Sequence, residues 1–160
     1  MGNFFAQNGQ IICRLLIAIV LGMFIGAERV LVHKEAGMKT HALVSLGAAL
    51  FIIISEYLSV MYSGVSGYNP AMIASNIIVG IGFLGAGSII FQGTRLKGLT
   101  TASGLWVTAG IGMAAGYGLF SLAIITTALI LMIFVLMNIF EKPLLKISDE
   151  KFVDANKKEL

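Results

Sequence analysis

Two long stretches without charge constrain the fold of this chain more than any other feature. No Asp, Glu, Lys or Arg occurs between Glu56 and Arg95, a run of 38 residues, or between Lys97 and Glu141, a run of 43. A helix that crosses a bilayer needs about 20 mostly apolar residues, so each stretch has room for one or two spans. Hydrophobic residues make up 58% of the 160-residue chain and charged residues only 12%. This balance excludes a soluble enzyme or a nucleic-acid-binding protein and indicates a multi-pass membrane protein.

Five apolar segments are separated by charged or turn-rich residues. Backbone polar groups in hydrocarbon must be hydrogen-bonded within their own segment, so each segment is expected to be a helix. The sequence therefore predicts an all-α membrane protein with five transmembrane helices in a domain over residues 1–142, followed by a short cytoplasmic tail over residues 143–160. The five helices are expected at about residues 11–27, 40–58, 71–91, 100–116 and 119–140.

The distribution of basic residues predicts the orientation of the helices. Only Arg14 lies near the face that carries the N-terminus, where it either snorkels to the outer headgroups or belongs to a cleaved signal peptide. The positive-inside rule therefore places the N-terminus outside and the C-terminus in the cytoplasm. The ten basic residues expected on the cytoplasmic side are Arg29, Lys34, Lys39, Arg95, Lys97, Lys142, Lys146, Lys151, Lys157 and Lys158.

Two short echoes in the sequence suggest an internal repeat. Residues 24–27 (FIGA) resemble residues 83–86 (FLGA), and residues 37–40 (GMKT) resemble residues 98–101 (GLTT). The pattern predicts two parallel helix-pair repeats, related by an axis along the membrane normal, plus a fifth helix. Because the identities are few, a chance match is the alternative.

Small residues at four-residue spacing, namely Gly22 with Gly26, Gly82 with Ala86 and Gly112 with Gly116, predict close packing between helices. The cluster at residues 80–87 also matches G-x-G-x-x-G, but a dinucleotide site needs an acidic residue about 20 positions later, and the next acid here is Glu141. A break in the third helix remains the alternative for this cluster. The expected packing glycines are Gly22, Gly26, Gly80, Gly82, Gly85, Gly87, Gly112 and Gly116.

A few polar side chains beside the apolar segments have both a structural and a functional interpretation. Glu28 lies one residue past the first segment, where a carboxylate needs a partner, and either Arg29 or a cation of the loop at residues 95–97 is expected to supply it. Asn76 either hydrogen-bonds to another helix or lines a polar path. Thr100 and Thr101 are expected to N-cap the fourth helix.

Patterns typical of enzymes or metal sites do not occur in the sequence. His33 and His41 lack metal-ligand spacing, and Ser103 lacks the frame of a nucleophilic serine. The single cysteine, Cys13, allows no internal disulfide. The sequence therefore predicts a protein that is not an enzyme, with no catalytic residue, no metal and no cofactor.

Four segments carry a resemblance to a known family: GAER (26–29), AGMKTHALVSLGAALF (36–51), GIGFLGAGSI (80–89) and KGLTTASGLWVTAGIGMAAGYG (97–118). They resemble the MgtC/SapB family of bacterial inner-membrane proteins. The resemblance implies about five membrane helices in the inner membrane and a short member without the cytoplasmic domain of some relatives. The functional positions that it implies are Glu28, Arg29, Lys39, Thr40, Asn76, Lys97, Thr100, Thr101 and Trp106, to which the predicted repeat adds Arg95.

The function implied by the resemblance is linked to magnesium limitation. Family members are associated with growth in low magnesium, survival inside host cells and restraint of the ATP synthase, and they look more like regulators than pumps. The leading hypothesis is a non-enzymatic regulator that acts by helix–helix contact with a second copy or another membrane complex. The alternative is a transporter or channel-like module for Mg²⁺ or another small solute. The expected partners are the lipid bilayer and membrane proteins, and no nucleic acid.

Overall fold

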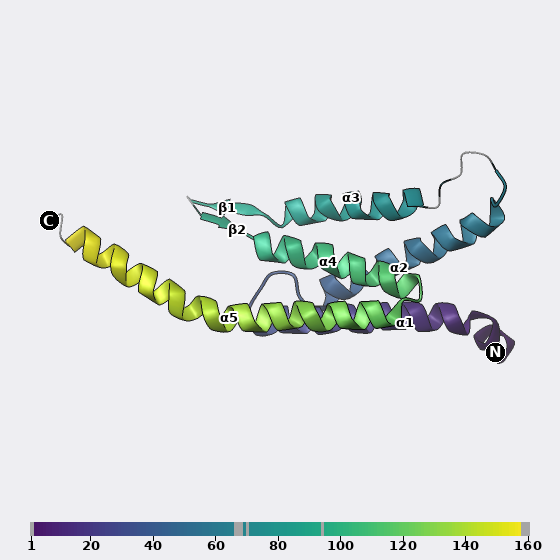
Figure 1. Cartoon of the computed structure of the whole chain (residues 1–160), viewed down its shortest axis with the longest axis horizontal. Coiled ribbons are helices and arrows are strands. Elements are labelled where there is room, and N and C mark those ends of the chain that lie inside the picture. The colour runs from purple at the N-terminus through teal and green to yellow at the C-terminus, as the bar shows by residue number, and fades with distance from the viewer. Residues whose placement is uncertain (1, 66–68, 70, 94, 158–160) are drawn as a thin grey trace.

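The computed structural model describes residues 2–65, 69, 71–93 and 95–157, and for residues 2–7, 95 and 141–157 it describes only the backbone. The helices run alongside one another as a bundle, and α5 continues beyond the bundle toward the C-terminus (Figure 1). In chain order, the elements are α1 (Gly2–Leu31), α2 (Met38–Met61), α3 (Ala71–Gly87), β1 (Ile90–Gln92), β2 (Arg95–Lys97), α4 (Leu99–Gly116) and α5 (Phe120–Lys157).

Helix α4 is the centre of the bundle. It contacts α1, α2, α3 and α5, and more than half of its residues are buried. Helix α3 contacts α4 and α2 and lies at one edge of the bundle (Figure 1), with only Ile81 and Gly85 buried. The largest buried apolar cluster joins α1, α2, α4 and α5 and is rich in alanine. Small side chains let helix backbones approach closely, which is how membrane helices gain packing energy.

The sequence predicts five transmembrane helices, and the described part of the chain contains five helices. Three are long and apolar enough to cross a membrane, at residues 8–31, 38–61 and 120–140. Helix α3 has 17 residues and α4 has 18, which corresponds to roughly 26 Å at the α-helical rise. Helix α4 carries glycine and threonine where the outer helices carry larger apolar residues, because its neighbours are other helices.

The end of the third helix was predicted wrongly. The sequence predicts a helix over residues 71–91, but α3 ends at Gly87 and the chain enters an antiparallel hairpin that pairs Ile90 with Lys97 and Gln92 with Arg95. Gly93 begins the hairpin turn with a φ of 64°, a conformation that glycine adopts without strain. Short apolar runs rich in isoleucine and phenylalanine suit either a helix or a strand, so periodicity alone cannot place this boundary.

The N-cap of α4 also differs from the prediction. The N-cap is Gly98, with a φ of 93° and no side-chain hydrogen bond to the helix, whereas Thr100 and Thr101 were expected to cap it. A side chain at Gly98 would collide with the backbone carbonyl of Ser88, so the turn from β2 into α4 requires glycine. The two threonines therefore lie inside the first helical turn.

Helices α1 and α5 extend beyond the apolar segments that define them in the sequence. Helix α1 begins at Gly2, before the predicted start at residue 11. Helix α5 continues through the predicted tail to Lys157. Both extensions are polar, so the apolar pattern alone does not reveal them.

Candidate functional site

A charged pair is buried where α1 meets α5. Glu28 and Arg29 are only 8% and 1% exposed, and their side chains form an ion pair. The Nδ2 of Asn138 on α5 donates a hydrogen bond of 2.9 Å to Glu28 Oε1. The Arg29 guanidinium lies 3.5 Å from the centre of the Phe134 ring, which adds a cation–π contact. Both charges are therefore held by residues of this chain, and Arg29 is an ionic partner of Glu28, as one of the two predicted alternatives had it.

A second buried polar group joins α2 to α4. The hydroxyl of Thr108 donates to the carbonyl of Gly104 at 2.8 Å, so its oxygen accepts from His41 Nδ1, also at 2.8 Å. His41 Nε2 and the hydroxyl of Ser45 are buried without a hydrogen-bond partner in the described part of the chain. Unsatisfied buried polar atoms are uncommon, so they mark a position where a ligand or water has groups to bind.

Four glycines hold α2 tightly between α1 and α4. A Cβ at Gly22 would lie 2.6 Å from the carbonyl oxygen of His41, and one at Gly26 would lie 2.5 Å from the Cα of Met38. On the other side of α2, a Cβ at Gly112 would collide with the carbonyl of Ser45. A Cβ at Gly116 would lie 2.8 Å from the carbonyl oxygen of Ala49. These contacts leave no room for a side chain, so each position requires glycine.

The glycines of α3 have different surroundings. A Cβ at Gly85 would lie 3.6 Å from that of Ala102 on α4, which is ordinary contact. At Gly80, Gly82 and Gly87, no atom of the described chain lies within 4 Å of such a Cβ, apart from the adjoining residues and the nearby backbone of α3 itself. Helix α3 is continuous through all four glycines.

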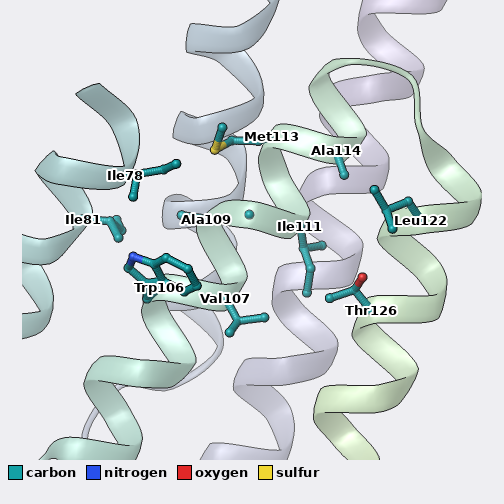
Figure 2. Close-up of a pocket in the computed structure, with 11 residues that line it drawn as sticks. Ile78, Ile81, Trp106, Val107, Ala109, Ile111, Met113, Ala114, Leu122 and Thr126 are labelled. Carbon is teal, nitrogen blue, oxygen red and sulfur yellow. The ribbon is translucent and has the colours of Figure 1, made fainter. Parts of the chain in front are cut away.

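The remaining predicted residues lie apart from the buried charged pair. Lys39 and Thr40 are exposed at the start of α2. Asn76 is exposed and lines an apolar groove of about 610 Å³ between α2 and α3. The indole of Trp106 faces α3, in a cavity of about 340 Å³ that Ile78 and Ile81 also line (Figure 2).

The residues of the β2–α4 connection line a cavity of their own. Lys97, Thr100 and Thr101 border a polar cavity of about 470 Å³ together with residues of the α1–α2 loop. The backbone of Arg95 lies in β2, and its side chain lies outside the described residues.

The sequence profile of the MgtC family matches residues 15–143 of the chain, a range that includes the buried pair, the glycine contacts and the hairpin. The chain belongs to the MgtC family. Its matched range begins in α1 and ends in α5, so the family pattern covers the whole bundle.

Several curated proteins are similar to this MgtC family member. YhiD of Escherichia coli K12, named as a candidate magnesium transporter, is 41% identical over 133 residues, which are 80% of this chain and 62% of YhiD. MgtC of Salmonella typhimurium LT2 is 44% identical over 120 residues, or 75% of this chain and 49% of that protein. MgtC of Brucella abortus is 40% identical over 130 residues, which are 81% of this chain and 50% of that protein. The chain thus spans about half to three-fifths of the length of these relatives. No solved structure matches it.

An ion pair near the other end of the bundle was not anticipated from the sequence. Arg14 of α1 pairs with Glu56 of α2 at 2.5 Å and also donates to the carbonyl of Gly116 at 3.0 Å. This arginine thus links α1, α2 and the end of α4. The two residues are 42 positions apart, so only the antiparallel packing of α1 on α2 brings them together.

The buried histidine was also missed. His41 and Ser45 are four residues apart on α2, and Thr108 is the polar residue that faces them from α4. Their four-residue spacing places His41 and Ser45 on one helix face, a signal that the sequence did contain. The pairing with Thr108 has no such signal, because it depends on which face of α4 turns toward α2.

Proposed function

We propose that this MgtC family protein is a non-enzymatic regulator of the bacterial inner membrane, linked to magnesium limitation, that acts through contact between its helices and those of a partner. The partner is a second copy of the chain or another membrane complex. We further propose that α3 and α4 lie within the membrane together with the three longer apolar helices.

The open surface of α3 is the observation that carries this proposal. Gly80 and Gly82 are exposed and have no neighbour within 4 Å in the described chain. In lipid, small residues favour association because another helix can approach the backbone closely. Asn76 is exposed on the same helix, and its amide can hydrogen-bond to a partner helix inside the membrane. Gly80 and Asn76 line the groove between α3 and α2, whereas Gly82 lines the groove between α3 and α4, so these residues lie on two sides of α3. Both sides suit a helix of another subunit better than lipid chains.

The rest of the bundle supports α3 as a stable platform. The glycines of α1 and α4 fix α2 between them, and Gly85 packs against Ala102 of α4. In the buried Glu28–Arg29 pair, Glu28 accepts a hydrogen bond from Asn138 and Arg29 lies over the Phe134 ring. We infer that these signature residues hold the bundle together and leave α3 free for contact.

The proposed orientation has the N-terminus outside and the C-terminus in the cytoplasm. Lys34, Lys39 and Lys97 lie at the end of the bundle where α2 and α4 begin. Arg14 lies toward the opposite end and is paired with Glu56. We therefore expect its charge to have little influence on the orientation, which the basic residues of the other side set.

Substitution of Gly82 tests the proposed contact. Gly82→Leu is expected to accumulate in the membrane at the wild-type level, because the side chain enters open space, but to lose association and to fail to restore growth in low magnesium to a strain lacking the protein. Gly110→Leu on α4 is the matched control, since Gly110 also has no neighbour within 4 Å. Association is measured by crosslinking of Gly82→Cys in a Cys13→Ser background, because Cys13 is free and exposed. Normal growth and normal association of Gly82→Leu would refute the proposal.

Transport of magnesium is the second candidate function. It is favoured by the buried His41 Nε2 and Ser45 hydroxyl, which offer unpaired polar atoms at the centre of the bundle. Uptake of Mg²⁺ into vesicles that contain the purified protein distinguishes the two. Uptake that His41→Phe abolishes and Gly82→Leu retains would favour transport over helix contact.

A further inference from the structure

We propose that the polar cavity between the α1–α2 loop and the start of α4 binds a phosphate group. The cavity has a volume of about 470 Å³. His33, Lys34 and Glu35 line it from the loop, and residues 96–101 line it from β2 and the first turn of α4. This volume lies within the usual range of small-molecule sites. No residue of α3 lines this cavity, so the site does not depend on the proposed helix contact.

The N-terminus of α4 supplies backbone donors to the cavity. The first hydrogen bond of the helix runs from Ala102 N–H to Gly98 O at 2.8 Å, so the N–H groups of residues 99–101 have no acceptor within the helix. Gly98 has no side chain to cap them. These donors and the positive end of the helix dipole favour an anion.

Thr101 provides an independent indication of a ligand. The residue is 5% exposed and lines the cavity. No hydrogen bond joins its hydroxyl to another residue in the part of the chain that the structure describes, so the hydroxyl is available to a group in the cavity. An anion at the helix N-terminus would accept a hydrogen bond from this hydroxyl, as well as from the backbone.

Two lysines give the cavity its charge. Lys34 and Lys97 both line it and are exposed, and neither forms an ion pair with a described residue. Helix α1 ends in a Schellman motif, in which His33 has a left-handed backbone with a φ of 56°. The N–H of Lys34 donates to the carbonyl of Arg29 at 2.9 Å, which fixes the backbone of Lys34 at the edge of the cavity. Glu35 is the opposing charge, so the lining side chains have a net charge of about +1 before the helix dipole is added.

A phosphate group fits this combination of donors better than a carboxylate does. The lining offers backbone N–H groups, a hydroxyl and two ammonium groups as donors, and a phosphate has three or more oxygens to accept from them. The same chemistry is found in the headgroup of an anionic phospholipid and in a soluble phosphate. Both sources can reach a cavity at the end of a membrane bundle.

Two binding assays on the full-length protein test the site and separate the two sources. The first titrates inorganic phosphate into protein in an uncharged detergent by calorimetry. The second measures phosphatidylglycerol retained by protein from mixed vesicles with phosphatidylcholine, using native mass spectrometry. Binding in either assay is expected to weaken roughly tenfold in Lys34→Gln and in Lys97→Gln, the size expected for one lost hydrogen bond to a charged group. Thr101→Val should also weaken binding, since it removes the hydroxyl and keeps the shape.

Two further variants make the prediction specific. Glu35→Gln removes the opposing charge and is expected to tighten binding, which a purely structural role would not produce. Lys39→Gln is the matched control, because Lys39 is exposed at the start of α2 but does not line the cavity. Size-exclusion profiles verify that each variant is folded.

Each outcome of the two assays bears on the proposal. Binding of inorganic phosphate alone would identify a soluble ligand, retention of phosphatidylglycerol alone would identify a headgroup, and both together would support the shared chemistry. The proposal would be overturned if the wild-type protein bound neither probe, or if folded Lys34→Gln and Lys97→Gln bound both as the wild type does.

Discussion

Neutralising Glu28 is expected to destabilise the bundle strongly, because it leaves a buried cation without its partner. In Glu28→Gln the Arg29 guanidinium stays 1% exposed, and the Phe134 ring is its main remaining favourable contact. Removing one member of a buried ion pair costs roughly 3–5 kcal/mol. When the bundle comes apart, Arg29 can reach the aqueous interface, so this cost is borne by the folded state alone.

The matched control is Glu35→Gln, in the loop that follows α1. Glu35 is exposed and forms no ion pair with a described residue, so its substitution should change the free energy of unfolding by no more than ~1 kcal/mol. A third variant, Asn138→Leu, removes only the hydrogen bond to Glu28 and should cost about 1–3 kcal/mol.

Unfolding of the purified protein by SDS in mixed micelles measures all three variants on one scale. The double variant Glu28→Gln with Arg29→Met removes both charges and should recover much of the lost stability, since a well-packed apolar pair can replace a buried ion pair. Equal and mild effects of Glu28→Gln and Glu35→Gln would refute this reasoning and would leave Glu28 as a signal that only ends the first membrane segment.

Three further expectations follow from the fold. A reporter fused to the C-terminus should be active on the cytoplasmic side, and a periplasmic signal would contradict the orientation derived from the basic residues. Gly112→Ala should lower the free energy of unfolding by roughly 1–3 kcal/mol in the SDS assay, because the added methyl group meets the Ser45 carbonyl. Gly110→Ala on the same helix is the control, since its methyl group enters open space. Equal stabilities of the two variants would rule out close contact of α4 with α2. Arg14→Gln should lower stability by no more than ~1 kcal/mol, since its partner Glu56 is 48% exposed, and a much larger loss would show that this pair anchors the bundle.

The apolar segments and the family were predictable from local sequence. Uninterrupted apolar residues must form helices in a membrane, because only a helix satisfies its backbone hydrogen bonds alone. The sequence motifs also identified the family, and the profile match over residues 15–143 confirms it. The echo of residues 24–27 at 83–86 does not extend to equal packing, since Gly26 is in close contact with Met38 and Gly85 makes only ordinary contact with Ala102, and the internal repeat stays a prediction.

The boundaries and caps were decided by the tertiary structure. The end of α3 at Gly87 depends on the pairing of β1 with β2, and the N-cap at Gly98 depends on the nearby Ser88 carbonyl. Neither contact is visible in a single segment of sequence. The four-residue spacing of small residues is likewise shared by Gly22 and Gly26 of α1 and by Gly82 and Ala86 of α3, but only packing distinguishes Gly22, which touches α2, from Gly82, which has open space around it.

The polar contacts were beyond the sequence for the same reason. Local sequence showed that Glu28 needs a partner and that Arg29 stands next to it, but Asn138 lies 110 residues away and reaches Glu28 only because α5 packs beside α1. His41 and Thr108 are 67 residues apart and meet across α2 and α4. The sequence by itself determined where the apolar helices lie, three of which are long and apolar enough to cross a membrane, since that depends on the transfer of each segment from water to lipid. The tertiary structure alone determined which polar side chains meet inside the bundle, since that depends on how each helix is rotated against its neighbours.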